Sequence, residues 1–269
     1  MTRKLFVHNH GYVELIDQMP QADGDQRVVD SARVSYAEGT KHTSSSEGLI
    51  RYLMRHWHTS PFEMVEFMFR IKMPLFVARQ HLRHRTANVN ETSARYSVVT
   101  DEFFVPEQVR EQAEVNKQGS TGEVDGSDTI AGTIYIANNA CHDHYLQLLE
   151  AGVCREQARM VLPQTMYTEF VWKIDLHNLM HFLRLRMDNH AQEEIRDYAN
   201  AMFKLVEPLV PFTMKAFRDF RLNAVQFSGP EVKLLKQLIS TRDSDIPGDG
   251  LSKGEAREFK DKVRTIINA

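Results

Sequence analysis

Cysteine is scarce in this chain of 269 residues, which contains only Cys141 and Cys154. Two cysteines cannot form the disulfide framework of a small secreted domain. No apolar run is long enough to span a membrane, and the basic residues Arg3 and Lys4 are not followed by the apolar stretch of a secretory signal. We therefore expect a protein of the reducing cytoplasm, without a membrane partner.

Common phosphate-binding and nucleophile motifs are also missing. The sequence has no Gly-x-Gly-x-x-Gly turn, no P-loop and no nucleophile elbow. Any dinucleotide would therefore be bound without a Rossmann turn. A net charge of -3 gives no reason to expect a general polyanion binder, so clustered cations are local features. A module that binds RNA or DNA phosphates is an alternative that this mild acidity disfavours.

Hydrophobic periodicity predicts strands and helices along most of the chain. Phe67 and Phe69 share one face of a half-buried strand within residues 62–72, and Phe170 and Trp172 do so within residues 165–174. Asp175 suits the N-cap of the helix that follows. The other predicted elements are strands at 4–16 and 96–105, a short helix or turn at 28–36, and helices at 47–57, 74–85, 133–160, 176–205 and from there through 220.

Composition separates a core from two less typical segments. Residues 106–132 are polar and rich in glutamate and glycine, which favours a surface insertion. After Asn223 the composition shifts, and helices are predicted at 231–239 and 253–267 around a turn at 245–250. We expect a core domain of residues 1–222, which contains the insertion, and a C-terminal helical extension of residues 223–269.

The strongest chemical signal lies between Arg83 and Ser93. Arg83, His84 and Arg85 are consecutive, and a loop of mostly small polar side chains separates them from Ser93 and Arg95. A helix end exposed to solvent needs no such loop. Guanidinium groups match the geometry of phosphate oxygens, and a hydroxyl with nearby backbone amides can complete an anion site. The pattern predicts a site for a nucleotide or another phosphate.

Two arginines stand out on later predicted helices. Arg186 and His190 are four residues apart, so they would share a helix face beside a buried stripe. An arginine in that position either pairs with a carboxylate or faces a ligand, and the spacing does not decide between them. Arg155 and Arg159 form a similar pair near the end of the preceding helix, where a solvent-exposed position is favoured.

Metal and thiol chemistry have weaker support. His177 and His181 are four apart and could bind zinc in a metal hydrolase, but Asn178 stands where the metalloprotease pattern has a glutamate. Cys141 lies on an apolar helix stripe and is expected in the core. Cys154 precedes an arginine that could lower its pKa, but it lacks a recognisable activating base.

The segment Arg83–Ser93 resembles the signature of the flavin-dependent thymidylate synthases, which is Arg-His-Arg, seven residues and then serine. Further blocks match this family in order and spacing between about Val28 and Phe220. They are Ser31–Tyr36, His58–Glu63, Ala78–Gln80, Glu91–Tyr96, Ala158–Pro163, Leu185–Arg186 and Asn189–Gln192.

The resemblance implies an α+β fold with a mixed sheet and long packed helices, in a homotetramer that shares active sites between chains. It implies non-covalently bound FAD and methylation of deoxyuridylate (dUMP) to thymidylate (dTMP). Methylenetetrahydrofolate would donate the carbon, reduced flavin the hydride, and NADPH would reduce the flavin. No cysteine nucleophile, metal ion or nucleic acid is expected.

The resemblance also implies roles for individual residues. Arg186 would be catalytic, because a guanidinium beside the uracil would stabilise an enolate-like anion and make C5 nucleophilic. Residues expected to contact the flavin are His58, Ser60, Arg83, His84, Arg85, Glu91, Asp175, His177 and His181. Residues expected to hold dUMP are Gln80, Arg83, Ser93, Arg95, Arg159 and Arg186.

Overall fold

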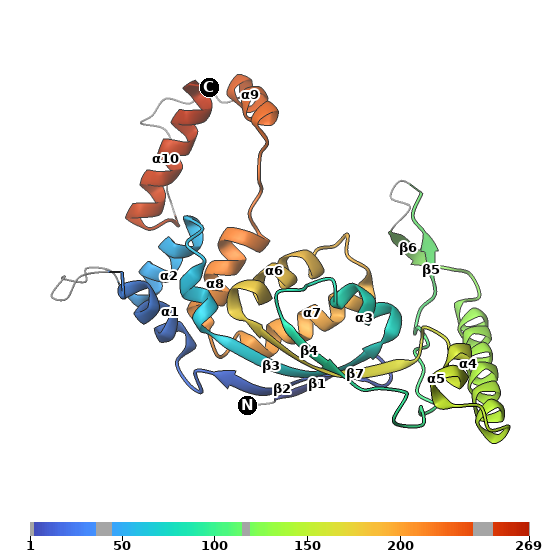
Figure 1. Cartoon of the computed structure of the whole chain (residues 1–269). Coiled ribbons are helices and arrows are strands. Elements are labelled where there is room, and N and C mark those ends of the chain that lie inside the picture. The colour runs from blue at the N-terminus through green and yellow to red at the C-terminus, as the bar shows by residue number, and fades with distance from the viewer. Residues whose placement is uncertain (1–2, 36–44, 115–118, 239–249, 269) are drawn as a thin grey trace. The chain divides into compact units, whose positions relative to one another are not determined.

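A computed structural model describes residues 3–35, 45–114, 119–238 and 250–268 of the chain. The chain divides into two compact units, Met1–Leu222 and Asn223–Ala269. In the first unit, five strands form one sheet in the order β1-β2-β3-β7-β4 (Figure 1). These strands are β1 (Lys4–Val7), β2 (Gly11–Met19), β3 (Glu66–Pro74), β7 (Tyr167–Asp175) and β4 (Asn88–Glu91).

Every pair of neighbouring strands in this sheet is antiparallel. The predicted α+β class is confirmed, because helices pack on an antiparallel sheet rather than alternating with parallel strands. The predicted mixed sheet was wrong. β3 and β4 run in the same direction, but β7 lies between them and pairs antiparallel with both.

Alternating apolar residues bury one face of the sheet, as the sequence predicts. Phe67 and Phe69 of β3 are at most 1% exposed, and Phe170 and Trp172 of β7 are at most 2% exposed. Helices α3, α6 and α7 cover this face (Figure 1). Full burial of each large apolar side chain stabilises the fold by roughly 1.5–3 kcal/mol. The covering helices are α3 (Leu75–His81), α6 (Leu176–Arg186) and α7 (Glu193–Val206).

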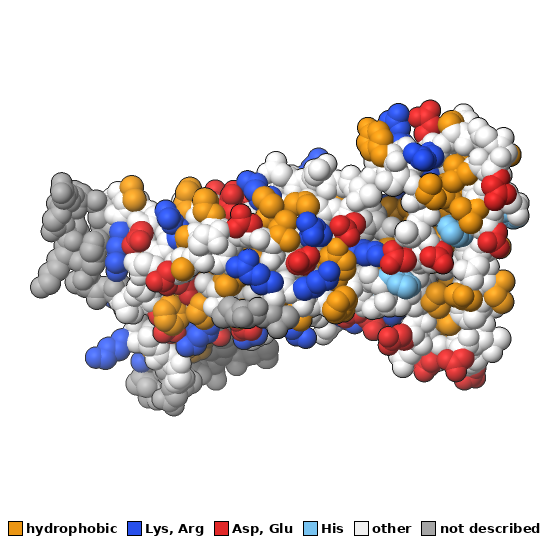
Figure 2. All heavy atoms as spheres, turned by 90° about the horizontal axis from the view of Figure 1, so that it is seen from below, with side chains coloured by type: hydrophobic (Ala, Val, Ile, Leu, Met, Phe, Trp, Pro, Cys, Tyr) orange, Lys and Arg blue, Asp and Glu red, His pale blue; other side chains and the backbone are white. Residues whose placement is uncertain are grey.

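The opposite face of the sheet carries side chains of both charges (Figure 2). Arg70 on β3 lies 3.8 Å from Glu14 on β2 and 3.9 Å from Glu169 on β7. Lys173 lies 2.9 Å from Glu66. Solvated pairs of this kind contribute little stability, about 0–1 kcal/mol each. They keep the outward positions of the alternating strands polar.

Carboxylates fix the starts of two helices in this unit. Asp175 caps α6 as predicted, since its Oδ1 accepts a hydrogen bond from the Asn178 amide at 2.9 Å. Asp25 accepts from the amides of Phe212 and Thr213 at 2.7 and 3.0 Å, and so joins α1 to the start of α8. The bounds are α1 (Gly24–Arg33), α2 (Ser46–Arg55), α8 (Pro211–Phe217), the 3-10 helix η1 (Ser60–Met64) and the π turn η3 (Arg218–Leu222).

The long helix predicted at 176–205 is two helices. α6 ends at Arg186 and α7 begins at Glu193, with an irregular turn between them. Within this turn the Asp188 side chain accepts a hydrogen bond from the His190 amide at 2.8 Å, which replaces helical bonding. Arg186 and His190 therefore do not share a helix face, and His190 is exposed to solvent.

Three boundaries around the cationic segment also differ from prediction. The helix predicted at 74–85 ends at His81, so the three cations follow the helix rather than ending it. Part of the predicted loop is the edge strand β4, which pairs with β7. The strand predicted at 96–105 is irregular apart from an isolated bridge between Phe103 and Met166. Pairing with β7 is a long-range interaction that local sequence does not encode.

The polar insertion contains regular structure. β5 (Arg110–Gln112) and β6 (Ser120–Glu123) form a two-stranded antiparallel sheet. The long helix α4 (Ser127–Glu150) begins before the predicted position of 133, and α5 (Arg155–Ala158) and η2 (Arg159–Val161) follow separately. Tyr145 of α4 is fully buried, but Cys141, which was expected in the core, is only half-buried. Tyr135 and Ile136 are 57% and 68% exposed.

The second unit consists of helices α9 (Gly229–Leu238) and α10 (Lys253–Asn268) within its described part. Both predicted helices are present. Most of the predicted turn at 245–250 lies outside the described residues, as does Tyr36 of the N-terminal block. No helix in the described ranges is long and apolar enough to cross a membrane.

Candidate functional site

Arg186 and His84 form the centre of the candidate site. Arg186 Nε donates a hydrogen bond to His84 Nε2 at 3.1 Å, and Arg186 Nη2 donates to the Gln80 carbonyl oxygen at 3.0 Å. The last turn of α6 is thus attached to the end of α3 and the residues just after it. The prediction that Arg186, His84 and Gln80 act in one site is consistent with this contact across about a hundred residues of sequence.

The imidazole of His84 is neutral at physiological pH. Burial lowers its pKa to about 4, with further lowering by Arg186 and then His181. Because Arg186 Nε can only donate, His84 Nε2 must be unprotonated and the ring proton must lie on Nδ1. Burial, followed by the charge of Arg83, also lowers the pKa of Arg186. This guanidinium still carries its charge at neutral pH, because the ordinary pKa of arginine lies far above 7.

Several residues predicted to contact flavin line one pocket next to this centre. His58 follows α2, and His177 and His181 project from α6 into the same pocket. The His181 and His84 rings are 6.0 Å apart between centroids. The pocket thus connects the predicted flavin side to the Arg186 pair.

Aromatic and cationic groups that the sequence did not single out complete this pocket. They are Trp57, Arg184 and Arg221. The Arg221 guanidinium stacks 3.5 Å from the centroid of the Trp57 ring and donates to the Met54 carbonyl oxygen. Arg184 lies two residues before Arg186, and this proximity was the only feature of the sequence that could have pointed to it. Arg221 lies in a π turn, which composition does not reveal.

The remaining predicted flavin residues have varied positions. Arg83 and Arg85 are exposed beside His84, and Ser60 is exposed at the start of η1. Glu91 accepts a hydrogen bond from the Thr168 hydroxyl at 2.5 Å, across the pairing of β4 with β7. Asp175 uses both carboxylate oxygens on Asn178, so its described contacts are those of a helix cap.

Apart from Arg83, which is exposed beside His84, the predicted dUMP residues fall into two groups. Gln80 and Arg186 touch each other, as described above. Ser93, Arg95 and Arg159 lie with the segment around α5, where Arg95 pairs with Glu156 at 3.1 Å. Within the described ranges, no hydrogen bond or ion pair joins this second group to Arg186. One chain therefore does not by itself link all the predicted dUMP residues through hydrogen bonds or ion pairs among the described residues.

His81 is a buried residue that the sequence reasoning missed. Its ring is completely buried, and neither ring nitrogen has a hydrogen-bond partner. It packs against Trp172, Phe182 and Phe170, with ring centroids 4.3, 4.8 and 5.3 Å away. Burial lowers its pKa to about 3, with smaller effects from His84 and Arg186. This neutral ring supports the segment that carries His84.

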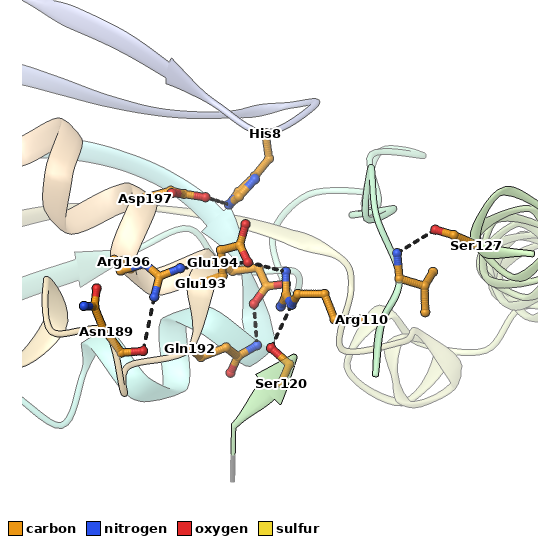
Figure 3. A network of polar contacts seen from close by, with 11 residues as sticks. His8, Arg110, Ser120, Ser127, Asn189, Gln192, Glu193, Glu194, Arg196 and Asp197 are labelled. Atoms are coloured by element: carbon orange, nitrogen blue, oxygen red, sulfur yellow. Dashed lines mark hydrogen bonds and ion pairs between the residues drawn. The ribbon is translucent and has the colours of Figure 1, made fainter. Parts of the chain in front are cut away.

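A separate cavity of about 810 Å³ lies between the β1–β2 hairpin, residues 104–110 and α7. Its wall includes His8 and Asp197, whose side chains are 3.8 Å apart, and the charged cluster around Arg110 (Figure 3). None of the residues predicted for catalysis, flavin or dUMP lines this cavity. The Arg186 centre, and not this larger hollow, therefore remains the candidate site.

Metal ligation was an alternative use of His177 and His181. Within the described residues, no group of three or more His, Cys, Asp or Glu side chains is placed to hold a metal ion. Both cysteines are free thiols, half-buried at Cys141 and exposed at Cys154. The chemistry available at the site is therefore that of guanidinium, imidazole and amide groups, which suit anionic heterocycles and phosphates.

An antiparallel α+β fold with arginine and imidazole groups gathered where α3 meets α6 defines a class of protein with a site suited to anionic heterocycles or phosphates. A family model described as "Thymidylate synthase complementing protein" matches residues 14–212. The chain belongs to this family, which is also known as Thy1.

Relatives match the chain over nearly its whole length. It is 47% identical to a flavin-dependent thymidylate synthase of Ruegeria pomeroyi, over 96% of this chain and 87% of that protein. It is 46% identical to one of Dictyostelium discoideum, over 97% of this chain and 86% of that protein. Most of the segment after Asn223 therefore has a counterpart in these relatives.

A solved structure is similar as well. The UMP/dUMP methylase PolB from Streptomyces cacaoi, bound with 5-Br dUMP, has a TM-score of 0.73 and 34% identity. The match covers 81% of this chain and 99% of that chain. It supports the α+β fold assignment made from the strands and helices alone.

Proposed function

We propose that this protein methylates dUMP to dTMP as a flavin-dependent thymidylate synthase. The carbon comes from methylenetetrahydrofolate, and bound FAD, once reduced by NADPH, supplies the hydride. The full-length match to enzymes of that name carries the activity. The hydrogen-bonded Arg186–His84 pair is the structural observation that best supports the choice of site.

The residues around the α6 pocket fit a flavin nucleotide. Trp57 offers an aromatic surface, and His58, His177 and His181 offer ring contacts and hydrogen bonds. Arg184, Arg221 and the exposed pair Arg83 and Arg85 offer positive charge for the diphosphate. FAD would be held there by stacking and charge, in keeping with the absence of a Gly-x-Gly-x-x-Gly turn from the sequence.

Arg186 would stabilise the reacting uracil. His84 and the Gln80 carbonyl engage two of its five N–H groups, which fixes the plane of the guanidinium. The other N–H groups are then free to donate to a uracil carbonyl oxygen and to stabilise the enolate-like anion. Negative charge delocalised to C5 makes that carbon the nucleophile toward the folate methylene group, so no cysteine adduct is needed.

The second group, Ser93, Arg95 and Arg159, would hold dUMP from another chain of the assembly. Two observations support a homotetramer with shared sites. The α6 pocket of one chain has a cavity of only about 60 Å³, far below the roughly 300–1,000 Å³ of usual ligand sites. α4 leaves Tyr135 and Ile136 largely exposed, as a helix at a subunit interface would. The cytoplasmic location expected from the sequence stays a prediction.

The catalytic assignment is tested by replacing Arg186 with alanine in the flavin-loaded protein. We expect dTMP formation to fall by at least about a hundredfold, as when one donor to a developing oxyanion is lost. Flavin content and the mass of the assembly, measured by light scattering, should stay unchanged. Activity within a few-fold of the wild-type protein would remove Arg186 from this role.

A further inference from the structure

A continuous chain of polar contacts joins the insertion to the candidate site. Arg110 on β5 donates to Glu194 Oε1 at 2.7 Å, and Gln192 Nε2 donates to Glu194 Oε2 at 2.7 Å (Figure 3). Gln192 Oε1 in turn accepts from Gln80 Nε2. The Gln80 backbone carbonyl oxygen accepts from Arg186, so four side chains and this carbonyl connect the β5–β6 hairpin to the proposed catalytic arginine.

The hydrogen bonds in this chain of contacts all donate toward Glu194, which sets their direction. Burial alone would raise the pKa of Glu194, but hydrogen bonds from Arg110 and other groups outweigh burial and lower it. An ionised carboxylate only accepts hydrogen bonds, so the NH₂ group of Gln192 must face it. The oxygen of Gln192 must then face Gln80, and the NH₂ group of Gln80 must point toward Gln192.

The consequence for a ligand concerns the side-chain oxygen of Gln80. With Nε2 committed to Gln192, Oε1 is the end of the Gln80 amide left to face a ligand, and it can only accept. A uracil N3–H group or a sugar hydroxyl would satisfy it, whereas a carbonyl or phosphate oxygen would be repelled. The direction of these hydrogen bonds thus selects what kind of group the Gln80 side chain can bind.

We propose that Arg110 is a positioning residue for dUMP binding, which acts through Glu194 and Gln192 to keep the Gln80 oxygen turned toward an N–H or O–H group of the nucleotide. This inference rests on the proposed function. It gives the insertion a role, because Arg110 belongs to β5 and its Nε also donates to Ser120 of β6 at 3.0 Å. Arg110 is not expected to touch substrate or flavin.

Arg196 provides a matched control for Arg110. This arginine of α7 lies 3.9 Å from Glu193, the same carboxylate that lies 3.0 Å from Arg110. The Arg196 side chain also donates to the Asn189 carbonyl oxygen at 3.3 Å (Figure 3). Among the described residues, no hydrogen bond or ion pair joins this side chain to Glu194 or Gln192, although the Arg196 backbone amide donates to the Gln192 carbonyl oxygen at 3.1 Å. Its replacement removes one positive charge from the same cluster and leaves the chain of contacts intact.

The test compares steady-state kinetics of Arg110→Gln, Arg110→Lys and Arg196→Gln with the wild-type holoenzyme. For Arg110→Gln we expect the KM for dUMP to rise by about tenfold, the effect of roughly one hydrogen bond, with kcat within about twofold. Arg110→Lys should recover part of this loss, and Arg196→Gln should match the wild-type protein. Flavin absorbance should be the same in all four proteins.

Glu194→Gln is a second variant that leaves the hairpin unchanged. An amide at this position can donate to Gln192 and reverse the direction of the hydrogen bonds that lead to Gln80. The KM for dUMP should therefore rise as in Arg110→Gln. Equal KM values for Arg110→Gln and Arg196→Gln, or a wild-type KM for Glu194→Gln, would overturn the inference. If the wild-type protein neither binds dUMP nor forms dTMP, the proposed function fails, and the inference fails with it.

Discussion

His81, beneath the candidate site, is a buried residue whose two ring nitrogens have no hydrogen-bond partner. His81 has a folded-state pKa of about 3 because it is completely buried, against an ordinary value of 6.5. Between these two values the unfolded chain takes up a proton that the folded protein excludes. His81 therefore lowers the free energy of unfolding progressively as pH falls from about 6.5 toward about 3, and its effect grows no further below that.

Replacing His81 by phenylalanine should stabilise the protein, and more so in acid. At pH 5 the exclusion of this proton lowers the free energy of unfolding by about 2 kcal/mol, and phenylalanine avoids this loss. Removal of two unpaired buried nitrogens adds a gain that does not depend on pH. Urea unfolding at pH 8 and pH 5 measures both. An equal gain at the two pH values would show that His81 is not the buried neutral group described above.

Arg186, His84 and Gln80 were selected as site residues from the sequence, but the contact between them could not be predicted from it. His84 lies in the segment whose residue types and spacing predict a phosphate site, whereas spacing left the role of Arg186 open. The family resemblance supplied roles for all three residues. The contact depends on α6 ending at Arg186 beside the end of α3, which requires the whole sheet. His81 escaped notice because a lone histidine on an apolar helix face gives no chemical signal.

At the scale of elements, local sequence predicted types well and boundaries less well. The strand at β3 and the cap at Asp175 follow from alternation and from a short-range hydrogen bond. The break between α6 and α7 and the edge strand β4 depend on a turn at Asp188 and on pairing with β7. Neither event leaves a periodic pattern, so neither was predicted.

Asp175 allows its capping role to be separated from its expected flavin contact. Asp175→Ala should lower the free energy of unfolding by about 1 kcal/mol, because the Asn178 amide loses its partner. Asp175→Ser should restore most of that stability, since a hydroxyl also caps. If flavin affinity falls equally in both variants, Asp175 contacts flavin as well. Unchanged stability in Asp175→Ala would contradict the cap.

At the scale of the whole molecule, the main apolar core lies entirely within the first unit, between Val7 and Phe217. We propose that residues 1–222 form a domain that folds by itself. A chain ended after Leu222 should unfold cooperatively, with a midpoint within a few degrees of that of the full chain. Calorimetry of both chains measures this. A shortened chain without a cooperative transition would show that the segment from Asn223 is part of the folding unit.

The account as a whole is tested most directly by the visible absorption spectrum of the wild-type protein reconstituted with FAD. The account predicts a flavin band that persists through gel filtration, bleaches on addition of NADPH, and accompanies dTMP formation when dUMP and methylenetetrahydrofolate are supplied. A protein that leaves the column without flavin absorbance and forms no dTMP would contradict it.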